Sequence, residues 1–187
     1  MFNLGEAVKL EWSPEDEFLR ARVRMKDGTA AELRPAQPED RPRLELMFRS
    51  CSSETLYTRF LSPGLGVPLR YLNRLMEHRP PKILSLVAVV GAEEQSRVVA
   101  LMNYVETEPT PRGEIAIVVL DDFQNRGLGL GMLQCLYALA KAQGVKNFVA
   151  DIDADNRRVF HLIQRSGLPC KISIDQGVAH AEVEMSS

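Results

Sequence analysis

Three alternate glycines, Gly127, Gly129 and Gly131, stand between an apolar stretch and an amphipathic one. Residues 115–120 are apolar and partly β-branched, which predicts a strand over residues 114–120, whereas residues 127–143 have helical periodicity. Alternate glycines let the backbone approach a bulky group, and the first N–H groups of a helix have no partners within it. Those donors and the helix dipole favour an anion. The segment therefore predicts a phosphate site or, more simply, close packing of the helix on the strand.

The two common nucleotide-binding motifs do not fit this segment. The dinucleotide fingerprint requires a glycine where the chain has Met132. The P-loop requires a Lys-Ser/Thr pair, which the segment lacks. A phosphate ligand at this place would therefore belong to another class.

The rest of the chain predicts a mixed α+β sheet. We expect strands at residues 23–26, 30–34, 84–90, 98–105, 114–120, 147–152, 171–175 and 178–184, and helices at residues 38–49, from 52 or 53 onward, 68–77, 127–143 and 155–166. Short turns such as Asp27-Gly28 join the early strands, so the central twisted sheet should be mostly antiparallel and flanked by helices. We expect an N-terminal arm of residues 1–22, with a short helix from Ser13, and a single domain of residues 23–187.

Composition limits the classes of partner. The chain has 187 residues, of which 45% are hydrophobic, and this suits one packed core. A net charge of −2 argues against a general nucleic-acid-binding protein, because phosphate binding needs a concentrated positive field. The basic run Arg20, Arg22, Arg24 and Lys26 is a local exception. It is either the solvated edge of a strand or helix, or a docking stripe for an acidic partner.

Three cysteines, Cys51, Cys135 and Cys170, have no spacing typical of a metal site and cannot all pair within one chain. This usage is typical of a reducing compartment. The first residues do not have the pattern of a signal peptide, and no stretch approaches the roughly 20 apolar residues that span a bilayer. We therefore expect a cytoplasmic protein that uses no metal and contacts no membrane.

The order Gln-x-x-Gly-x-Gly after a strand resembles the coenzyme A pyrophosphate loop of the GNAT (Gcn5-related N-acetyltransferase) family. Gln124, Gly127 and Gly129 occupy the fixed positions of that loop. The resemblance covers most of residues 30–185 and implies the GNAT acyl-CoA N-acyltransferase fold, with acetyl-CoA as cosubstrate. It also implies that backbone N–H groups of about residues 126–131 hold the pyrophosphate.

The resemblance assigns coenzyme contacts to three parts of the chain. Main-chain groups of Val118, Val119 and Leu120 would pair with the pantetheine arm, the loop would contribute Gln124, Asn125, Arg126, Gly127, Leu128, Gly129, Leu130 and Gly131, and the late helix would contribute Asn156. Two of these side chains have a structural alternative. Arg126 could be a solvent-facing counter-charge, and Asn156 could be an ordinary N-cap.

Glu114 is the candidate general base. Acyl transfer to an amine needs the neutral amine, and a free lysine with a pKa of about 10.4 is almost fully protonated at pH 7. Glu114 precedes a run of apolar strand residues, and an apolar setting would raise the pKa of its carboxyl toward the working pH. The strand resembles the one that carries the catalytic glutamate in protein-acetylating GNAT members. Alternatively, Glu114 is the exposed first residue of an edge strand.

The late helix departs from the family at the general acid. Many members have a tyrosine there that protonates the leaving thiolate, and Ile163 stands at that place. Because a thiol is a tolerable leaving group with a pKa of about 8.5, water can take that role. The resemblance implies direct attack by the amine without an acyl-enzyme. We expect Cys135 to belong to the core of the following helix.

The acceptor is the least defined part of the prediction. Residues 53–60 and 69–72 resemble the corresponding stretches of bacterial Pat-type protein lysine acetyltransferases, which favours a protein lysine. Two alternatives remain, a small-molecule amine N-acetyltransferase and a non-catalytic acyl-CoA-binding regulatory module. The sequence does not predict the oligomeric state.

Overall fold

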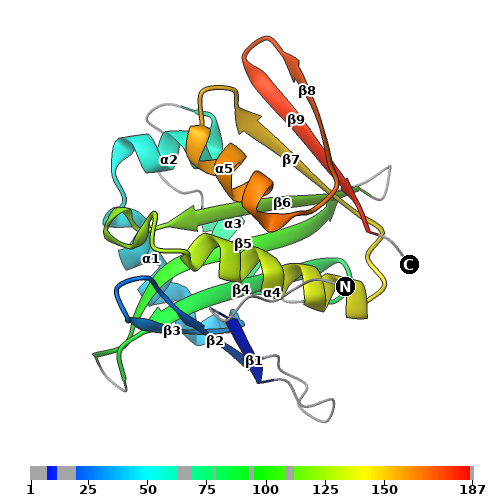
Figure 1. Cartoon of the computed structure of the whole chain (residues 1–187). Coiled ribbons are helices and arrows are strands. Elements are labelled where there is room, and N and C mark those ends of the chain that lie inside the picture. The colour runs from blue at the N-terminus through cyan, green and yellow to red at the C-terminus, as the bar shows by residue number, and fades with distance from the viewer. Residues whose placement is uncertain are drawn as a thin grey trace.

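The computed structural model of the chain describes residues 8–11, 20–62, 69–77, 79–92, 95–107 and 112–185. They form a nine-stranded sheet in the order β1-β2-β3-β4-β5-β6-β7-β9-β8, with helices packed on it (Figure 1). Every strand pair is antiparallel except β6–β7. This confirms the predicted α+β class with a mostly antiparallel sheet. The helix predicted from Ser13 lies outside the described residues.

The elements follow the predicted order closely. The strands are β1 Val8–Glu11, β2 Arg20–Arg24, β3 Ala30–Pro35, β4 Ile83–Val90, β5 Arg97–Thr107, β6 Arg112–Val119, β7 Asn147–Asp153, β8 Cys170–Asp175 and β9 Val178–Glu184. The α-helices are α1 Arg41–Arg49, α2 Ser53–Phe60, α3 Leu69–Leu75, α4 Leu128–Ala142 and α5 Arg157–Ser166, and the 3₁₀ helices are η1 Pro38–Asp40 and η3 Asp121–Phe123.

The first hairpin forms as the Asp-Gly turn predicts. Gly28 has a φ of 87°, and the N–H of Thr29 donates to Asp27 Oδ1 at 3.0 Å. The sheet begins further upstream than expected, because β1 and the first three residues of β2 precede residue 23. The division of the chain into an arm and a domain stays a prediction.

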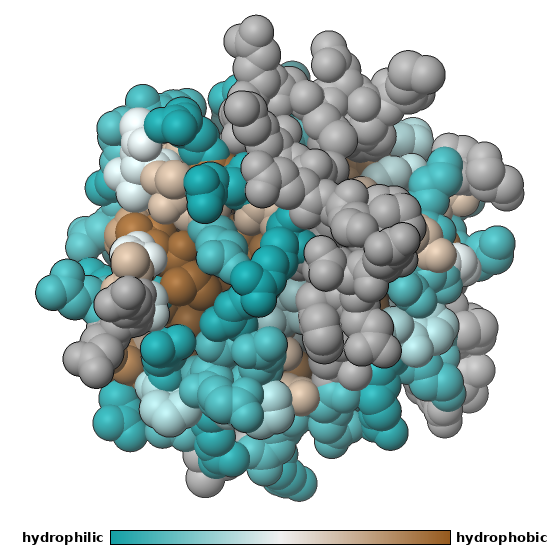
Figure 2. Space-filling view, turned by 90° about the horizontal axis from the view of Figure 1, so that it is seen from below, coloured by the Kyte–Doolittle hydropathy of each residue, from teal (hydrophilic) through white to brown (hydrophobic). Residues whose placement is uncertain are grey.

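The basic run lies mainly on β2 and has the alternation of a half-buried strand. Arg20, Arg22 and Arg24 are exposed, whereas Ala21 and Val23 between them are buried. The arginines therefore form the solvated side of a strand, the first of the two predicted interpretations. More generally, the face seen from below the view of Figure 1 is mainly hydrophilic where its residues are coloured, and its apolar side chains are most visible in one area (Figure 2).

Helices cover both faces of the sheet. In Figure 1, α4 and α5 lie on the near face and α1, α2 and α3 on the far face. Large side chains fill the space between layers, and Leu33, Leu101, Met132 and Phe148 are each 1% exposed or less. Each such burial stabilises the fold by roughly 1.5–3 kcal/mol relative to exposure. The core thus fixes α4 against the central strands.

The parallel pair β6–β7 separates soon after it begins. The whole of β6 pairs with β5, but β7 pairs with β6 only through Glu114 and Val149. The two strands diverge toward their C-terminal ends (Figure 1). The edge of β6 that faces β7 therefore has no neighbouring strand beyond Glu114, and this opening positions the candidate site.

Candidate active site

A cavity of about 500 Å³ occupies the space where β6 and β7 diverge. Its lining comes from α2–α5 and β5–β9, and includes Ile115, Ile117, Ala150 and Ile163. Ile163 stands where the family tyrosine was expected, so the cavity wall at that place is apolar. A largely apolar cavity beside an unpaired strand edge suits an extended thioester arm.

The part of β6 that lines the cavity precedes the residues predicted to pair with the coenzyme. Residues 114–117 line it, whereas Val118, Val119 and Leu120 do not appear in its wall. The main chain at this end is also engaged, since Leu120 N–H donates to Val99 O at 2.9 Å. Pairing of a pantetheine arm with residues 118–120 stays a prediction.

The start of α4 presents free hydrogen-bond donors. Gly127 is the N-cap with a φ of 92°, and no side chain caps the helix. The N–H groups of Leu128, Gly129 and Leu130 have no acceptor in the described part of the chain, as expected for a first helical turn. The Gly131 N–H, by contrast, donates to Gly127 O at 3.2 Å. Within this first turn, the donors available for a diphosphate are therefore those of residues 128–130.

Gly131 serves helix packing. A Cβ at this position would lie 2.6 Å from Val23 Cγ2, whereas one at Gly129 would lie 3.4 Å from Ile117 Cδ1 and 3.8 Å from Leu162 Cδ2. The simpler interpretation of the glycine run thus holds at Gly131. Gly129 instead adjoins Ile117 and Leu162, which both line the cavity, so the free N–H groups lie beside it.

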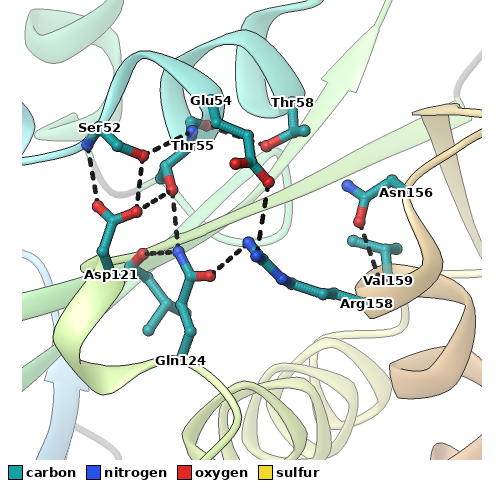
Figure 3. A network of polar contacts seen from close by, with 10 residues as sticks. Ser52, Glu54, Thr55, Thr58, Asp121, Gln124, Asn156, Arg158 and Val159 are labelled. Carbon is teal, nitrogen blue, oxygen red and sulfur yellow. Dashed lines mark hydrogen bonds and ion pairs between the residues drawn. The ribbon is translucent and has the colours of Figure 1, made fainter.

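Gln124 fixes the loop through its whole amide group (Figure 3). Its Nε2 donates to Thr55 Oγ1 and to Val119 O, each at 2.9 Å, and its Oε1 accepts from Arg158 Nη1 at 2.8 Å. Both amide hydrogens are therefore used within the protein. The Gln124 side chain holds the loop against α2 and α5 and has no N–H left for a pyrophosphate.

Asp121 anchors the same region to the start of α2. Its carboxylate accepts from Ser52 N–H at 2.9 Å, from Ser52 Oγ at 2.6 Å and from Thr55 Oγ1 at 2.8 Å (Figure 3). Burial alone would raise the pKa of Asp121, but these hydrogen bonds outweigh it and lower the pKa. The sequence assigned Asp121 only to a turn, because its partners lie 66 and 69 residues away.

Arg126 and Asn156 both have the structural roles that were the alternatives to a coenzyme contact. Arg126 forms an ion pair with Asp27 and lies 5.3 Å from the ring centre of Phe123, so it acts as a counter-charge to the first hairpin. Asn156 caps α5, with its Oδ1 accepting from Val159 N–H at 3.2 Å. Asn156 also lines the cavity, so the cap and a coenzyme contact are compatible.

Glu114 lies at the point where β6 and β7 separate, and it lines the cavity. It pairs with Val105 on one side and Val149 on the other, so it is not on an edge strand. The expected apolar setting is wrong in one respect, because the Glu114 side chain is exposed. Its apolar neighbour Ile115 points to the opposite face of the sheet, as strand alternation requires.

A second polar cluster, which we call the Arg59 cluster, lies in the same cavity and consists of Arg59, Tyr71 and Asn103. Arg59 Nη2 donates to Tyr71 Oη and, at 3.3 Å, to Asn103 Oδ1, and Tyr71 Oη donates to Asn103 Oδ1 at 3.1 Å. The sequence placed Arg59 and Tyr71 in the Pat-like stretches 53–60 and 69–72 but assigned neither of them a role in the site. The missed signal was Asn103, a polar residue in an apolar strand, which is 4% exposed.

Cys135 lies in the core, as expected, whereas Cys51 and Cys170 are partly exposed. Cys135 on α4 is 0% exposed, and burial raises the pKa of its thiol to about 12. A thiol with that pKa is almost fully protonated at neutral pH, which argues against a covalent role. Within the described ranges, no three His, Cys, Asp or Glu side chains gather as a metal site would need, and no helix has the length and apolar character to cross a membrane.

The profile of the acetyltransferase (GNAT) family matches residues 53–168, which is more than half of the chain. The chain therefore belongs to the GNAT acetyltransferase family. This match confirms the resemblance inferred from the glycine loop. GNAT members use acetyl-CoA, so the free N–H groups of residues 128–130 and the adjoining cavity fit a coenzyme that carries a diphosphate and an extended arm.

The chain is similar to acetyltransferases of the Pat type. It is 32% identical over 165 residues to acetyltransferase Pat of Mycolicibacterium smegmatis, covering 87% of this chain and 48% of that protein. It is 27% identical over 131 residues to acetyltransferase PA5475 of Pseudomonas aeruginosa, covering 70% of each. The GNAT domain of S. lividans PAT superposes with a TM-score of 0.79 at 26% identity, over 89% of this chain and 97% of that one.

The match to longer relatives is partial. A cAMP-binding acyltransferase from Mycobacterium smegmatis superposes with a TM-score of 0.61 at 26% identity, over 91% of this chain and 48% of that one. The chain thus spans about half the length of Pat.

Proposed function

We propose that this chain transfers an acetyl group from acetyl-CoA to a primary amine of a protein lysine, with Glu114 as general base. One arrangement carries the proposal: the cavity between β6 and β7 is lined by Glu114 and adjoins the free N–H groups at the start of α4. A diphosphate held at residues 128–130 would direct the thioester arm into the cavity.

Acetyl-CoA supplies an activated thioester carbonyl. Glu114 takes a proton from the acceptor ammonium, so that the amine can attack. The N–C bond then forms as the C–S bond breaks, and the second amine proton goes to the thiolate, with water in place of a dedicated acid. Over the whole reaction, one proton is released to solvent through Glu114. The exposure of Glu114 suits that last step, because the carboxyl can return its proton to water directly.

The similarity to Pat supports a protein lysine as acceptor, since the Pat-like stretches at residues 53–60 and 69–72 include Arg59 and Tyr71, which line the cavity. A small-molecule amine is the second candidate. An exposed Glu114 at an open cavity fits an acceptor that reaches in from outside, such as a side chain on a protein surface.

The test is acetyl-CoA turnover against a panel of lysine peptides, intact proteins and small amines, followed by free-thiol release and mass spectrometry of products. Glu114→Gln should bind acetyl-CoA as the unchanged protein does but lose about 10²–10⁴-fold in transfer. Glu32→Gln on β3, outside the cavity wall, is the matched control and should retain full turnover.

The outcomes separate the candidates. Acetylated lysine in peptide or protein supports the proposal, whereas products confined to free amines favour the small-molecule enzyme. Tight coenzyme binding without turnover by any acceptor would instead indicate a regulatory module. Full activity in Glu114→Gln would remove Glu114 from the mechanism.

A further inference from the structure

The Arg59 cluster places a positive charge inside the cavity, at a point where no carboxylate of the described residues is within ion-pair distance. No Asp or Glu oxygen of the described residues lies within 4.0 Å of the Arg59 guanidinium. Its Nε is fully buried and has no hydrogen-bond partner there. Its hydrogen bonds run from Nη2 to two neutral groups, Tyr71 Oη and Asn103 Oδ1. Within the described residues, the charge is therefore held in place and no carboxylate forms an ion pair with it.

Aromatic rings compensate part of the cost of this charge. The guanidinium carbon of Arg59 lies 5.0 Å from the ring centre of Phe60 and 5.1 Å from that of Tyr71. Ring faces and a fixed hydrogen-bond pair hold a guanidinium in one geometry at low cost in conformational freedom. Such a rigid charge acts on whatever binds next to it.

The Arg59 cluster and Glu114 act on the same part of the cavity. Asn103 pairs with Ala116 across β5–β6, so its side chain lies on the sheet face that also carries Glu114, two residues away. Burial raises the pKa of Tyr71, Arg59 opposes that rise, and the Glu114 carboxylate adds to it. The Tyr71 hydroxyl thus experiences both charges, and an amine bound there would as well.

Other titratable groups also line this cavity. They are Arg74 on α3, Asp151 on β7, which contacts His180 at 2.6 Å, and Cys170 on β8. Asp151 already has the His180 imidazole beside it, and Arg74 is a second cation. The acceptor end therefore combines one base, Glu114, with fixed positive charge from Arg59.

We propose that Arg59 is a fixed positive charge that keeps the acceptor amine in its neutral, nucleophilic form. This inference rests on the proposed function. A cation near a second cation favours its deprotonated state, as for lysines activated by a neighbouring positive group. Glu114 accepts the proton, and Arg59 prevents the amine from regaining it. Tyr71 and Asn103 position the guanidinium.

The experiment is the pH profile of kcat, with the best acceptor peptide of the panel at saturation. Arg59→Gln removes the charge but keeps an amide donor for Tyr71 and Asn103. The midpoint of its acidic limb should rise by roughly one pH unit or more. Activity lost at pH 7 should return near pH 9. Arg59→Lys keeps the charge, so its midpoint should stay within a few tenths of a unit even if kcat falls.

Asn103→Asp provides an independent variant that keeps Arg59. A carboxylate beside the guanidinium neutralises it, so the midpoint should rise as in Arg59→Gln. Tyr71→Phe removes a hydrogen bond but no charge, and its midpoint should not move. If Arg59→Gln fails to fold, Asn103→Asp decides the outcome.

The result that overturns the inference is distinct from the failure of the proposed function. Equal losses of kcat in Arg59→Gln and Arg59→Lys, with no movement of either midpoint, would leave Arg59 a purely structural role. The same holds if Asn103→Asp leaves the midpoint unchanged. If the unchanged protein acetylates nothing in the panel, the proposed function fails and this inference fails with it.

Discussion

Gly129 and Gly131, both in the first turn of α4, face different neighbours. At Gly131 an added methyl would meet Val23 Cγ2 at 2.6 Å, and Val23 is 1% exposed, so it has no room to move. At Gly129 the nearest atom would be Ile117 Cδ1 at 3.4 Å, the flexible end of a cavity-lining side chain. Gly131 therefore supports helix packing, whereas Gly129 borders the cavity.

Gly131→Ala should lower the free energy of unfolding by about 1–3 kcal/mol, because α4 must shift away from β2. Urea denaturation followed by circular dichroism measures this change. Gly129→Ala is the matched control and should leave stability unchanged or slightly improved, since alanine favours a helix. Equal stability of the two variants would show that the packing of α4 on β2 accommodates a methyl group at Gly131.

The Arg34–Asp40 pair joins two elements, β3 and η1. Arg34 Nη1 and Nη2 donate to Asp40 Oδ2 at 2.6 Å and Oδ1 at 2.7 Å, and Gln37 N–H donates to Oδ2 at 2.9 Å. Asp40 is 1% exposed. Burial would raise the pKa of Asp40, but the Arg34 and Gln37 hydrogen bonds lower it below its ordinary value.

Asp40→Asn should cost about 2–4 kcal/mol of stability at neutral pH, because the buried guanidinium of Arg34 loses its counter-charge. A lowered folded-state pKa stabilises the fold above the unfolded-state pKa of about 3.9, and this contribution is lost as pH falls through the folded-state value. The difference in the free energy of unfolding between Asp40→Asn and the unchanged protein should thus be constant from about pH 5 to 8 and should decrease below about pH 4. Urea titrations across pH test this, with exposed Glu39→Gln as control. If this difference stayed the same at acid pH, the lowered pKa of Asp40 would be contradicted.

The Asp121–Thr55–Gln124 network links α2 to the loop before α4 (Figure 3). Thr55→Val keeps the shape of a side chain that is 5% exposed but removes its hydroxyl. Gln124 then loses one of its two acceptors, and the loop is held less firmly. We expect coenzyme A to bind about fivefold to tenfold more weakly, equivalent to roughly 1 kcal/mol.

Isothermal titration calorimetry measures that change, with Ser53→Ala as the control on the exposed side of the same helix. If Thr55→Val binds coenzyme A as tightly as the unchanged protein, the network does not position the loop. A large loss in Ser53→Ala would point to general damage to α2.

At the scale of the whole molecule, the sequence predicted what repeats locally and missed what long-range contacts create. Helical and strand periodicity gave the class, the element order and the first hairpin, because each depends on neighbours in the chain. The divergence of β6 and β7 depends on pairing between strands far apart in sequence. It creates the cavity, and no local pattern marks it.

The site followed the same division. The free N–H groups of residues 128–130 were predictable from a strand, glycines and a helix in sequence. The engaged Gln124 amide, the exposed Glu114 and the Arg59 cluster were not, since each depends on partners from other elements. A cytoplasmic location and independence from metals stay predictions.

The central claim is that peptide N–H groups of the first turn of α4 hold the diphosphate of the coenzyme. Amide chemical shifts of the isotope-labelled protein test it most directly, with coenzyme A compared against pantetheine, which lacks the diphosphate. The amide protons of Leu128, Gly129 and Leu130 should move strongly downfield with coenzyme A alone, and that of Gly131, already bonded to Gly127 O, should move less. Coenzyme A that binds while residues 128–130 stay unmoved would contradict the account.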